Sequence, residues 1–180
     1  MVKNDSGKLL IIREDSPMYE DIFHIVHAYN QSSQLINDFS DKHENAAFMF
    51  PSIVCQSFAI ELLLKFFVLI DHPEICNRQD FEKFDLKLNK HGFSELWDLI
   101  NINYQNEIAR HHTNCVGNES SASRFKKLLE DIGSDSFVRW RYIHELEGLN
   151  FMHISDTKQT SDVLLSVAYS EMKKRVGGSI

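Results

Sequence analysis

The stretch PSIVCQSFAIELLLKFFVLI (51–70) decides the fold class of this chain. Its apolar side chains, from Ile60 to Val68, point in every direction around a helical axis, and a helix of that kind is usually the buried centre of a bundle. Pro51 suits the start of a helix, and DHP (71–73) ends it because the residue before a proline resists helical geometry. We therefore predict a buried central helix over about 51–70.

Amphipathic helices flank this segment on both sides. The first is expected over about 17–39, with Ser16 as its N-cap and Pro17 in its first position, and the polar stretch SDKHEN (40–45) ends it. After the central helix, the pattern of apolar residues predicts a third helix that Ser94 caps and that carries Leu96 to Ile108. Helices over about 125–132, 134–147 and 160–176 are expected to follow it.

The connecting segments carry little regular structure of their own. Residues 74–93 are expected to be a connector with one helical turn around Phe81 and Phe84, and HHTNCVGNESSAS (111–123) is expected to be a loop. Strand signals are confined to Leu9–Ile12. We predict one all-α domain over residues 1–180, an up-and-down bundle of five to six helices with residues 1–15 as an N-terminal extension.

Composition agrees with a packed helical domain. The chain has 180 residues, of which 43% are hydrophobic, and it holds only seven glycines and three prolines. All-β folds need a turn every dozen residues or so and are therefore disfavoured, as are disordered and low-complexity chains.

Charge is unevenly distributed along the chain. The net charge is −7, yet residues 121–180 hold nine basic and eight acidic side chains. The overall balance excludes a broad electrostatic grip on nucleic acid or anionic lipid, but a local anion site remains open in the last third.

The cysteines and the apolar runs indicate the cellular compartment in which the protein is expected. Three cysteines at wide spacings form no CxxC pair, which favours a reducing cytoplasm. The N-terminus lacks the apolar core of a signal peptide, and the run from Phe58 to Ile70 is shorter than the roughly 20 residues that a bilayer requires. We expect a cytoplasmic protein with no membrane partner.

Glu61 and Lys65 interrupt the central helix. The acidic residue precedes the basic one by four positions, the order that favours an ion pair. Buried charges generally need a partner, so one interpretation is an internal ion pair. The other places both residues beneath a functional site at the centre of the bundle.

The segment FVRWRYIHE (137–145) is the richest in chemistry. Arg139, Trp140, Arg141 and His144 lie within six positions. Arginine stabilises phosphate charge and histidine transfers protons near neutral pH. Together they suit cleavage of a phosphodiester without a metal, in which histidine handles a proton and arginine neutralises the pentavalent phosphorus oxygens.

Helical geometry qualifies this interpretation. On a straight helix Arg139 and His144 differ by about 140°, whereas Arg141 and His144 differ by only about 60°. The first pair converges only if the helix begins irregularly or if a second subunit supplies the partner. Alternatively, Arg141 and Glu145 form an ion pair and the aromatic residues belong to the core.

Metal and cofactor sites are poorly supported. Asp21, His24 and His27 are spaced three apart, but the chain holds no Glu-x-x-His of the kind that dimetal bundles use. His111-His112 and Cys115 lack the second pair of ligands that structural zinc requires. No phosphate-binding glycine loop is present. We predict neither metal nor cofactor.

Three segments in order resemble the HEPN superfamily. SFAIELLLKFFVL (57–69) is similar to its second helix, NKHGFSELWDLI (89–100) to the His-x-Leu-x-x-Leu element that opens its third, and FKKLLEDIGSDSFVRWRYIHE (125–145) to the Trp-Arg-Tyr stretch of one branch. The likeness covers about 51–145.

The resemblance implies a helical bundle that usually dimerises. In active members an Arg-x4-6-His motif from each subunit forms a metal-independent endoribonuclease site, and many members are toxins or phage-defence proteins with an antitoxin partner. Arg139 and His144 match that spacing. Trp140 departs from the small polar residue that commonly follows the arginine, and the Trp-Arg-Tyr branch commonly lacks a histidine at the place of His144. His91 matches the His-x-Leu element and is expected to cap or pack.

Two functions therefore remain open. The first is a homodimeric ribonuclease with Arg139 and His144 as catalytic residues, Arg141 and Trp140 binding RNA phosphate, and Glu61, Lys65 and Glu145 in support. The second is a non-catalytic module that binds a nucleotide, RNA or a partner protein, in which Trp140 and Arg141 contribute stacking and charge.

Overall fold

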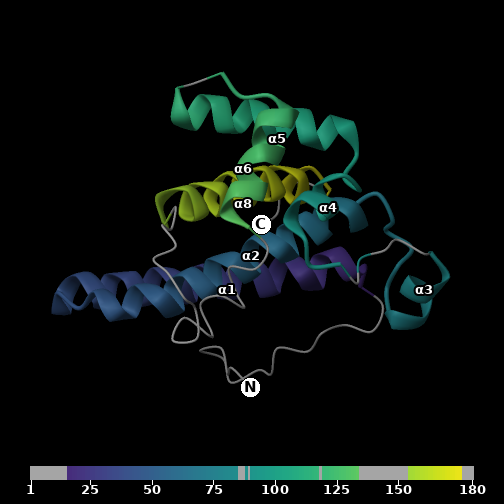
Figure 1. Ribbon diagram of the computed structural model, residues 1–180. Coiled ribbons are helices and arrows are strands. Elements are labelled where there is room, and N and C mark those ends of the chain that lie inside the picture. The colour runs from purple at the N-terminus through teal and green to yellow at the C-terminus, as the bar shows by residue number, and fades with distance from the viewer. Residues whose placement is uncertain (1–15, 85–87, 89, 118, 134–153, 176–180) are drawn as a thin grey trace.

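The chain folds into an all-α bundle (Figure 1). The computed structural model describes residues 16–84, 88, 90–117, 119–133 and 154–175, and no strand occurs within those ranges. The described elements are α1 (Met18–His43), the 3-10 helix η1 (Ala46–Phe48), α2 (Met49–Leu69), α3 (Arg78–Lys83), α4 (Phe93–Trp97), α5 (Ile102–Val116), α6 (Ala122–Ile132) and α8 (Ile154–Arg175). The predicted fold class is confirmed. The described part holds seven α-helices, more than the five to six expected.

α1 and α2 form a long antiparallel hairpin, and they lie side by side in Figure 1. Small polar residues let the two helices approach closely near the turn. The Ser33 and Ser52 hydroxyls are 2.8 Å apart, and Gln56 Nε2 donates to Ser33 Oγ at 3.0 Å. All three side chains are buried, so these bonds satisfy polar groups that would otherwise be costly inside the hairpin.

α2 is the centre of the bundle, as its apolar circumference predicts. It packs against α1, α8 and α4. Phe66 is fully buried, and its ring lies 6.1 Å from that of Tyr19, 5.8 Å from that of Phe23 and 5.2 Å from that of Phe67. Aromatic pairs at these separations add to the free energy gained by burial.

α2 is also the one helix among the described residues that is long and apolar enough to cross a membrane. Two thirds of its most apolar window is buried inside the protein. The core helix of a globular bundle passes the same test of length and composition, so the test by itself is a weak indication of a membrane span.

The predicted third helix is broken in two. α4 ends at Trp97 and α5 starts at Ile102, because Asn101 interrupts the helix and caps the second piece, its side chain accepting a bond from the Asn103 N–H at 3.0 Å. Gln105 Nε2 closes the break by donating to the carbonyls of Trp97 and Ile100. Ser94 is not the cap, since Gly92 holds that position in α4.

The expected loop over 111–123 is largely helical. α5 continues to Val116 and ends at Gly117, whose φ of 72° suits a residue without a side chain. α6 then starts at Ala122, with the Ser121 hydroxyl accepting from the Arg124 N–H. The prediction was wrong for 111–116 and 122–123, because polar residues of this stretch continue α5 and begin α6.

Other boundaries differ by smaller amounts. α1 continues four residues beyond its predicted end, to His43, and Pro17 rather than Ser16 occupies its N-cap position. The connector holds the short helix α3, as the turn around Phe81 suggested. α8 begins at Ile154, about six residues early, and packs on α2 and α5. The candidate strand at 9–12 and the expected helix over 134–147 lie outside the described residues.

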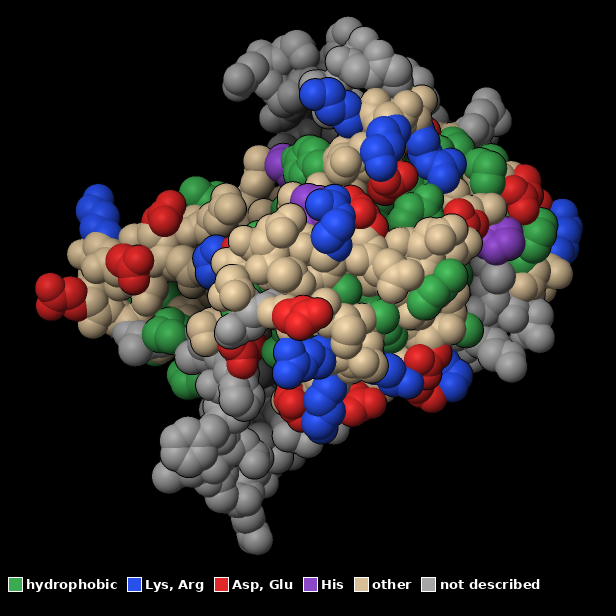
Figure 2. Space-filling model, turned by 90° about the horizontal axis from the view of Figure 1, so that it is seen from above, with side chains coloured by type: hydrophobic (Ala, Val, Ile, Leu, Met, Phe, Trp, Pro, Cys, Tyr) green, Lys and Arg blue, Asp and Glu red, His purple; other side chains and the backbone are tan. Residues whose placement is uncertain are grey.

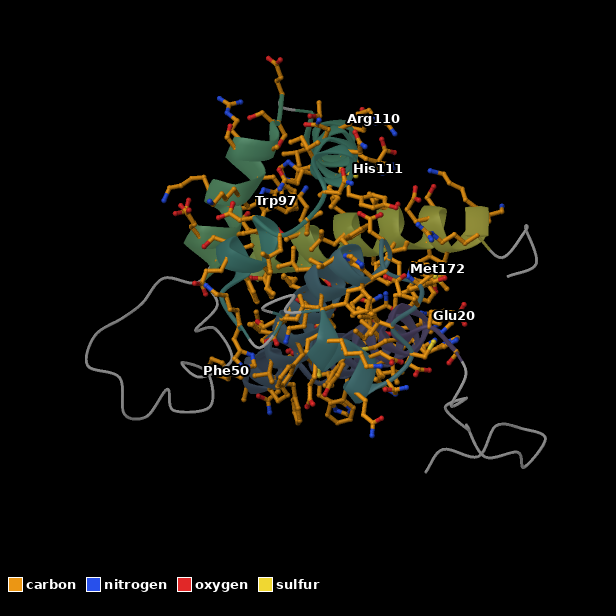
Figure 3. All side chains as sticks on the ribbon, turned by 90° about the vertical axis from the view of Figure 1, so that its right-hand side faces the viewer. Glu20, Phe50, Trp97, Arg110, His111 and Met172 are labelled. Carbon is orange, nitrogen blue, oxygen red and sulfur yellow. The ribbon has the colours of Figure 1, made fainter. Side chains whose placement is uncertain are left out.

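The turn of the α1–α2 hairpin carries exposed apolar side chains. In Figure 1 this end of the hairpin extends beyond the start of α8. Leu35 is 70% exposed, and Phe39, Phe48 and Phe50 also face solvent. Figure 3 shows Phe50 at the edge of the molecule, far from Trp97 in the packed interior. We call Leu35, Phe39, Phe48 and Phe50 the hairpin patch.

Candidate functional site

Most of the residues predicted for catalysis lie outside the described part of the chain. Arg139, Trp140, Arg141, His144 and Glu145 all fall within 134–153. The convergence of Arg139 and His144 therefore stays a prediction from the sequence. The two supporting residues in the central helix are described, and they form the core of the candidate site.

Glu61 and Lys65 form the ion pair that their spacing predicts. Lys65 Nζ donates to Glu61 Oε1 at 2.6 Å, and the two side chains are only 17% and 16% exposed. They lie on a less completely covered side of α2, since Glu61 and Lys65 keep some exposure while their neighbours Ile60 and Leu64 are fully buried. The pair therefore lies near the surface of the bundle rather than at its centre.

His91 completes a three-residue cluster. Its Nδ1 lies 2.9 Å from Glu61 Oε1, the same oxygen that accepts from Lys65. The imidazole is 74% exposed. His91 neither packs in the core nor caps α4, so the expected role was wrong. The backbone just before α4 places the histidine over the middle of α2, a contact between residues 30 positions apart that no local pattern reveals.

A second ion pair lies beside the cluster. Lys90 Nζ is 2.5 Å from Glu95 Oε1, and both side chains are largely exposed. The two residues lie on either side of His91 in the chain, and their charges neutralise each other. Exposed pairs of this kind contribute little to stability.

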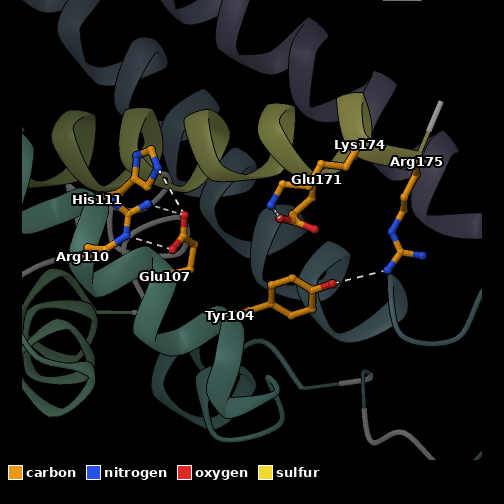
Figure 4. A network of polar contacts seen from close by, with 7 residues as sticks. All are labelled: Tyr104, Glu107, Arg110, His111, Glu171, Lys174 and Arg175. Carbon is orange, nitrogen blue, oxygen red and sulfur yellow. Dashed lines mark hydrogen bonds and ion pairs between the residues drawn. The ribbon is translucent and has the colours of Figure 1, made fainter. Parts of the chain in front are cut away.

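A larger polar network joins α5 to α8 (Figure 4). Glu107 accepts two bonds from Arg110, at 3.0 and 2.6 Å, and lies 3.6 Å from His111 Nε2. The bonds from Arg110 lower the pKa of the Glu107 carboxyl, and the same contact raises the pKa of the guanidinium. The Glu107 carboxylate therefore interacts with its neighbours Arg110 and His111 on α5.

The α8 side of this network holds basic residues of the last turn of that helix. Lys174 donates to Glu171, and Arg175 Nη2 lies 3.4 Å from Tyr104 Oη. The Arg175 guanidinium is also 5.7 Å from the centre of the Tyr19 ring. Since carboxylates neutralise two of the basic groups of the network, its surplus of positive charge is small.

Acidic and basic side chains of the described residues are intermingled on the face of the molecule that Figure 2 shows from above. A strong electrostatic footprint is the usual mark of a protein that binds nucleic acid by charge alone. This face carries no such footprint.

The histidines considered as metal ligands have other surroundings. His24 is exposed, and Nδ1 of His27 lies 2.8 Å from the Tyr169 hydroxyl of α8. His111 faces Glu107, while His112 packs on Phe125. Within the described ranges, no group of three or more His, Cys, Asp or Glu side chains is arranged to hold a metal ion.

A shallow pocket lies between the end of α5 and the start of α8. It measures about 490 Å³ and is lined by Cys115 and by Ser155, Lys158, Gln159, Asp162 and Val163. Lys158 and Asp162 pair at 2.5 Å within its wall. The two charged side chains of the lining thus neutralise each other, and the lining adds no convergent set of chemical groups.

The chain was also compared with protein-family models, with curated protein sequences and with solved structures, and none matches. The relation to the HEPN superfamily accordingly rests on the three sequence segments that resemble it.

Proposed function

We propose that this protein is a HEPN-like, metal-independent endoribonuclease that works as a homodimer. Arg139 and His144 carry the proposal, because four residues separate them, as in the Arg-x4-6-His motif of active members. Arg141 and Trp140 supply charge and stacking for the RNA backbone and bases. A toxin or phage-defence setting with an antitoxin partner follows from the same resemblance.

The reaction needs only groups that this chain contains. The 2′-oxygen of a ribose attacks the adjacent phosphorus and loses its proton to a base, for which His144 is suited. The bond between phosphorus and the 5′-oxygen breaks, and that oxygen takes up the proton that His144 removed. The products are a 2′,3′-cyclic phosphate and a 5′-hydroxyl, and arginine stabilises the extra negative charge in between.

The arrangement of the described helices supports the resemblance. Segment 57–69 lies in α2 and segment 89–100 contains α4. These two helices pack against each other, and α6, which holds the start of the third segment, packs on α4. The Glu61–His91 contact ties the first two segments together directly. A second subunit would complete the site by supplying the partner that a straight helix keeps about 140° away.

RNA cleavage in the presence of EDTA tests this proposal. The wild-type protein should cut a single-stranded RNA, and both Arg139→Ala and His144→Ala should remove the activity. His24→Gln serves as the control, because His24 is an exposed histidine on α1. Absence of cleavage by the wild type, or cleavage that survives His144→Ala, would overturn the proposal.

The hairpin patch favours a second candidate function, a non-catalytic module that binds a partner protein. Four large apolar side chains face solvent at one end of the molecule, and exposed clusters of this kind often mark interaction surfaces. If this is the main function, Trp140→Ala and Arg141→Ala should impair folding or binding more than His144→Ala does. Equal behaviour of the three variants would argue against it.

A further inference from the structure

The outer side of α1 carries a row of exposed residues, several of them apolar. Its members are three or four positions apart, and they are Ile25, Ala28, Ser32, Leu35 and Phe39. Ile25 is 42%, Leu35 70% and Phe39 47% exposed, whereas the buried residues of α1 lie on the side that meets α2. In Figure 1 the helices α5, α6 and α8 all lie on one side of the α1–α2 hairpin. We call this row the α1 seam.

The spacing of the α1 seam is that of a coiled-coil helix. Alternating steps of three and four residues keep side chains on one line along a helix, and a second helix buries such a line by packing beside it. The row from Ile25 to Phe39 is about 21 Å long, and a partner helix of three heptads, about 30 Å long, covers it. The pattern therefore indicates that a helix occupies the seam.

The middle and the end of the seam suit such a contact. Ala28 and Ser32 are small, so a partner backbone can approach α1 closely there. The Ser32 hydroxyl already donates to the Ala28 carbonyl at 2.8 Å, so its burial leaves no donor unsatisfied. The Phe39 ring lies 4.9 Å from that of Phe48 and 4.1 Å from that of His43. A side chain held in this way loses little conformational entropy on binding.

The charged groups at the Phe39 end of the seam are mainly acidic. Asp38 is next to Phe39 in the chain, and Asp41 and Glu44 follow in the last turn and at the C-cap of α1. All three carboxylates are exposed, and none forms an ion pair with another described residue. Lysine or arginine side chains on a partner helix would pair with them, whereas RNA phosphates and anionic lipids would be repelled.

A second copy of this chain suits the seam less well. α1 and its C-cap Glu44 hold five carboxylates and only one lysine or arginine, which is Lys42. Two copies of α1 side by side would therefore bring like charges together in either orientation, and like charges facing each other across an interface oppose association. The occupant that the charges favour is basic.

We propose that the α1 seam binds a basic amphipathic helix of a partner protein. That helix lies along α1 with its apolar side on the seam and with lysine or arginine side chains beside Asp38. The inference rests on the partner-binding function proposed above, for which it names the chemistry of the partner, and it does not depend on the ribonuclease site.

Synthetic peptides test the pattern and the charge separately. The first peptide has leucine at the a and d positions of three heptads and lysine at the flanking e and g positions, which also discourages it from pairing with itself. The second has glutamate at e and g, and the third has the composition of the first in an order without the heptad spacing. Fluorescence anisotropy should show that the first binds the full-length protein at least about tenfold more tightly than either of the others. Failure of the first peptide to bind, or equal binding of all three, would overturn the proposal.

Variants of the protein place the peptide on the seam. Leu35→Ala should weaken binding of the first peptide about tenfold, and Asp38→Asn about threefold. The controls Ile102→Ala, a 59% exposed side chain on α5, and Asp71→Asn, an exposed carboxylate in the turn after α2, should bind as the wild type does. Wild-type binding by Leu35→Ala would overturn the proposal.

Sedimentation equilibrium examines the competing occupant. Leu35→Ala should keep the oligomeric state of the wild type, and a dimer that this substitution dissociates would assign the seam to a second copy and overturn the proposal. RNA cleavage is a separate readout that Leu35→Ala should leave unchanged. Failure of the peptides to bind therefore overturns the role of the seam alone, and absence of RNA cleavage overturns the ribonuclease alone.

Discussion

Nδ1 of His91 lies 2.9 Å from Oε1 of Glu61, and the two residues are separated by 30 positions in the chain. This contact joins the segment before α4 to the middle of the central helix. It also turns an ion pair that would otherwise be internal to α2 into a three-residue cluster that reaches the surface.

Glu61→Gln should destabilise the fold measurably. The change removes the charge that Lys65 and His91 both contact and leaves the mostly buried ammonium without its partner, so we expect a loss of about 1.5–3 kcal/mol in the free energy of unfolding. Urea denaturation measures it. Glu95→Gln, in the exposed pair with Lys90, is the control and should cost at most about 1 kcal/mol. Equal losses would show that the Glu61 cluster has no special strength.

Phe66→Ala should be among the most damaging changes in the core. The ring is fully buried and contacts three other aromatic rings, so its removal leaves a cavity and should cost about 3–5 kcal/mol. Thermal and urea unfolding report the change. Leu35→Ala removes a 70% exposed side chain and should stay within about 0.5 kcal/mol of the wild type. A mild effect of Phe66→Ala would mean that α2 is not the centre of the core.

Tyr169→Phe tests the link between α1 and α8. The substitution keeps the ring that packs on Phe23 and removes the hydroxyl that meets His27 at 2.8 Å, so we expect a loss of about 0.5–1.5 kcal/mol. Tyr29→Phe on α1 is a matched control, since its ring stacks on Phe58 and its hydroxyl makes no hydrogen bond to another described residue. If both variants lose the same free energy, the bond to His27 contributes nothing to stability.

Acidification should destabilise the fold through His112. Burial lowers the pKa of this imidazole below its ordinary value of 6.5, so the unfolded chain binds the proton more readily than the folded one. The neutral His112 therefore contributes fully to stability at pH values above its ordinary pKa. That contribution is lost as the pH falls below the ordinary pKa and through the lowered pKa of the folded protein. Urea unfolding at about pH 7.5 and about pH 5.5 should show a smaller drop for His112→Gln than for the wild type. His24→Gln, at an exposed site, should keep the wild-type drop; a wild-type drop in His112→Gln would refute the role of His112.

The fold class and the central helix could be predicted from the sequence because they depend on local, periodic properties. A run that is apolar on all sides has only the interior to occupy, and the i,i+4 spacing of Glu61 and Lys65 makes their pairing a property of any helix. The end of α5 could not be predicted in the same way. The polar residues of its last turns are typical of a loop, yet buried Ile108 and Ala109 anchor the helix and Gly117 ends it.

Only part of the candidate site could be predicted from the sequence. The place of His91 depends on how the chain returns to α2 before α4, and no residue pattern encodes a contact across 30 positions. Asn101 caps α5 where the predicted third helix is broken. The sequence does not show that Asn101 is a cap, because the position of the break is seen only in the structure. Arg139 and His144 remain predictions from spacing.

The most direct measurement of the central claim is the chemistry of the RNA ends produced in EDTA. Mass spectrometry of the products of a defined RNA should show 2′,3′-cyclic phosphate and 5′-hydroxyl ends for the wild type. The same RNA with 2′-O-methyl groups should stay intact, as should unmodified RNA treated with Arg139→Ala or His144→Ala. Cleavage of the 2′-O-methyl RNA, cleavage that persists in His144→Ala, or no cleavage by the wild type would contradict a metal-independent ribonuclease built on Arg139 and His144.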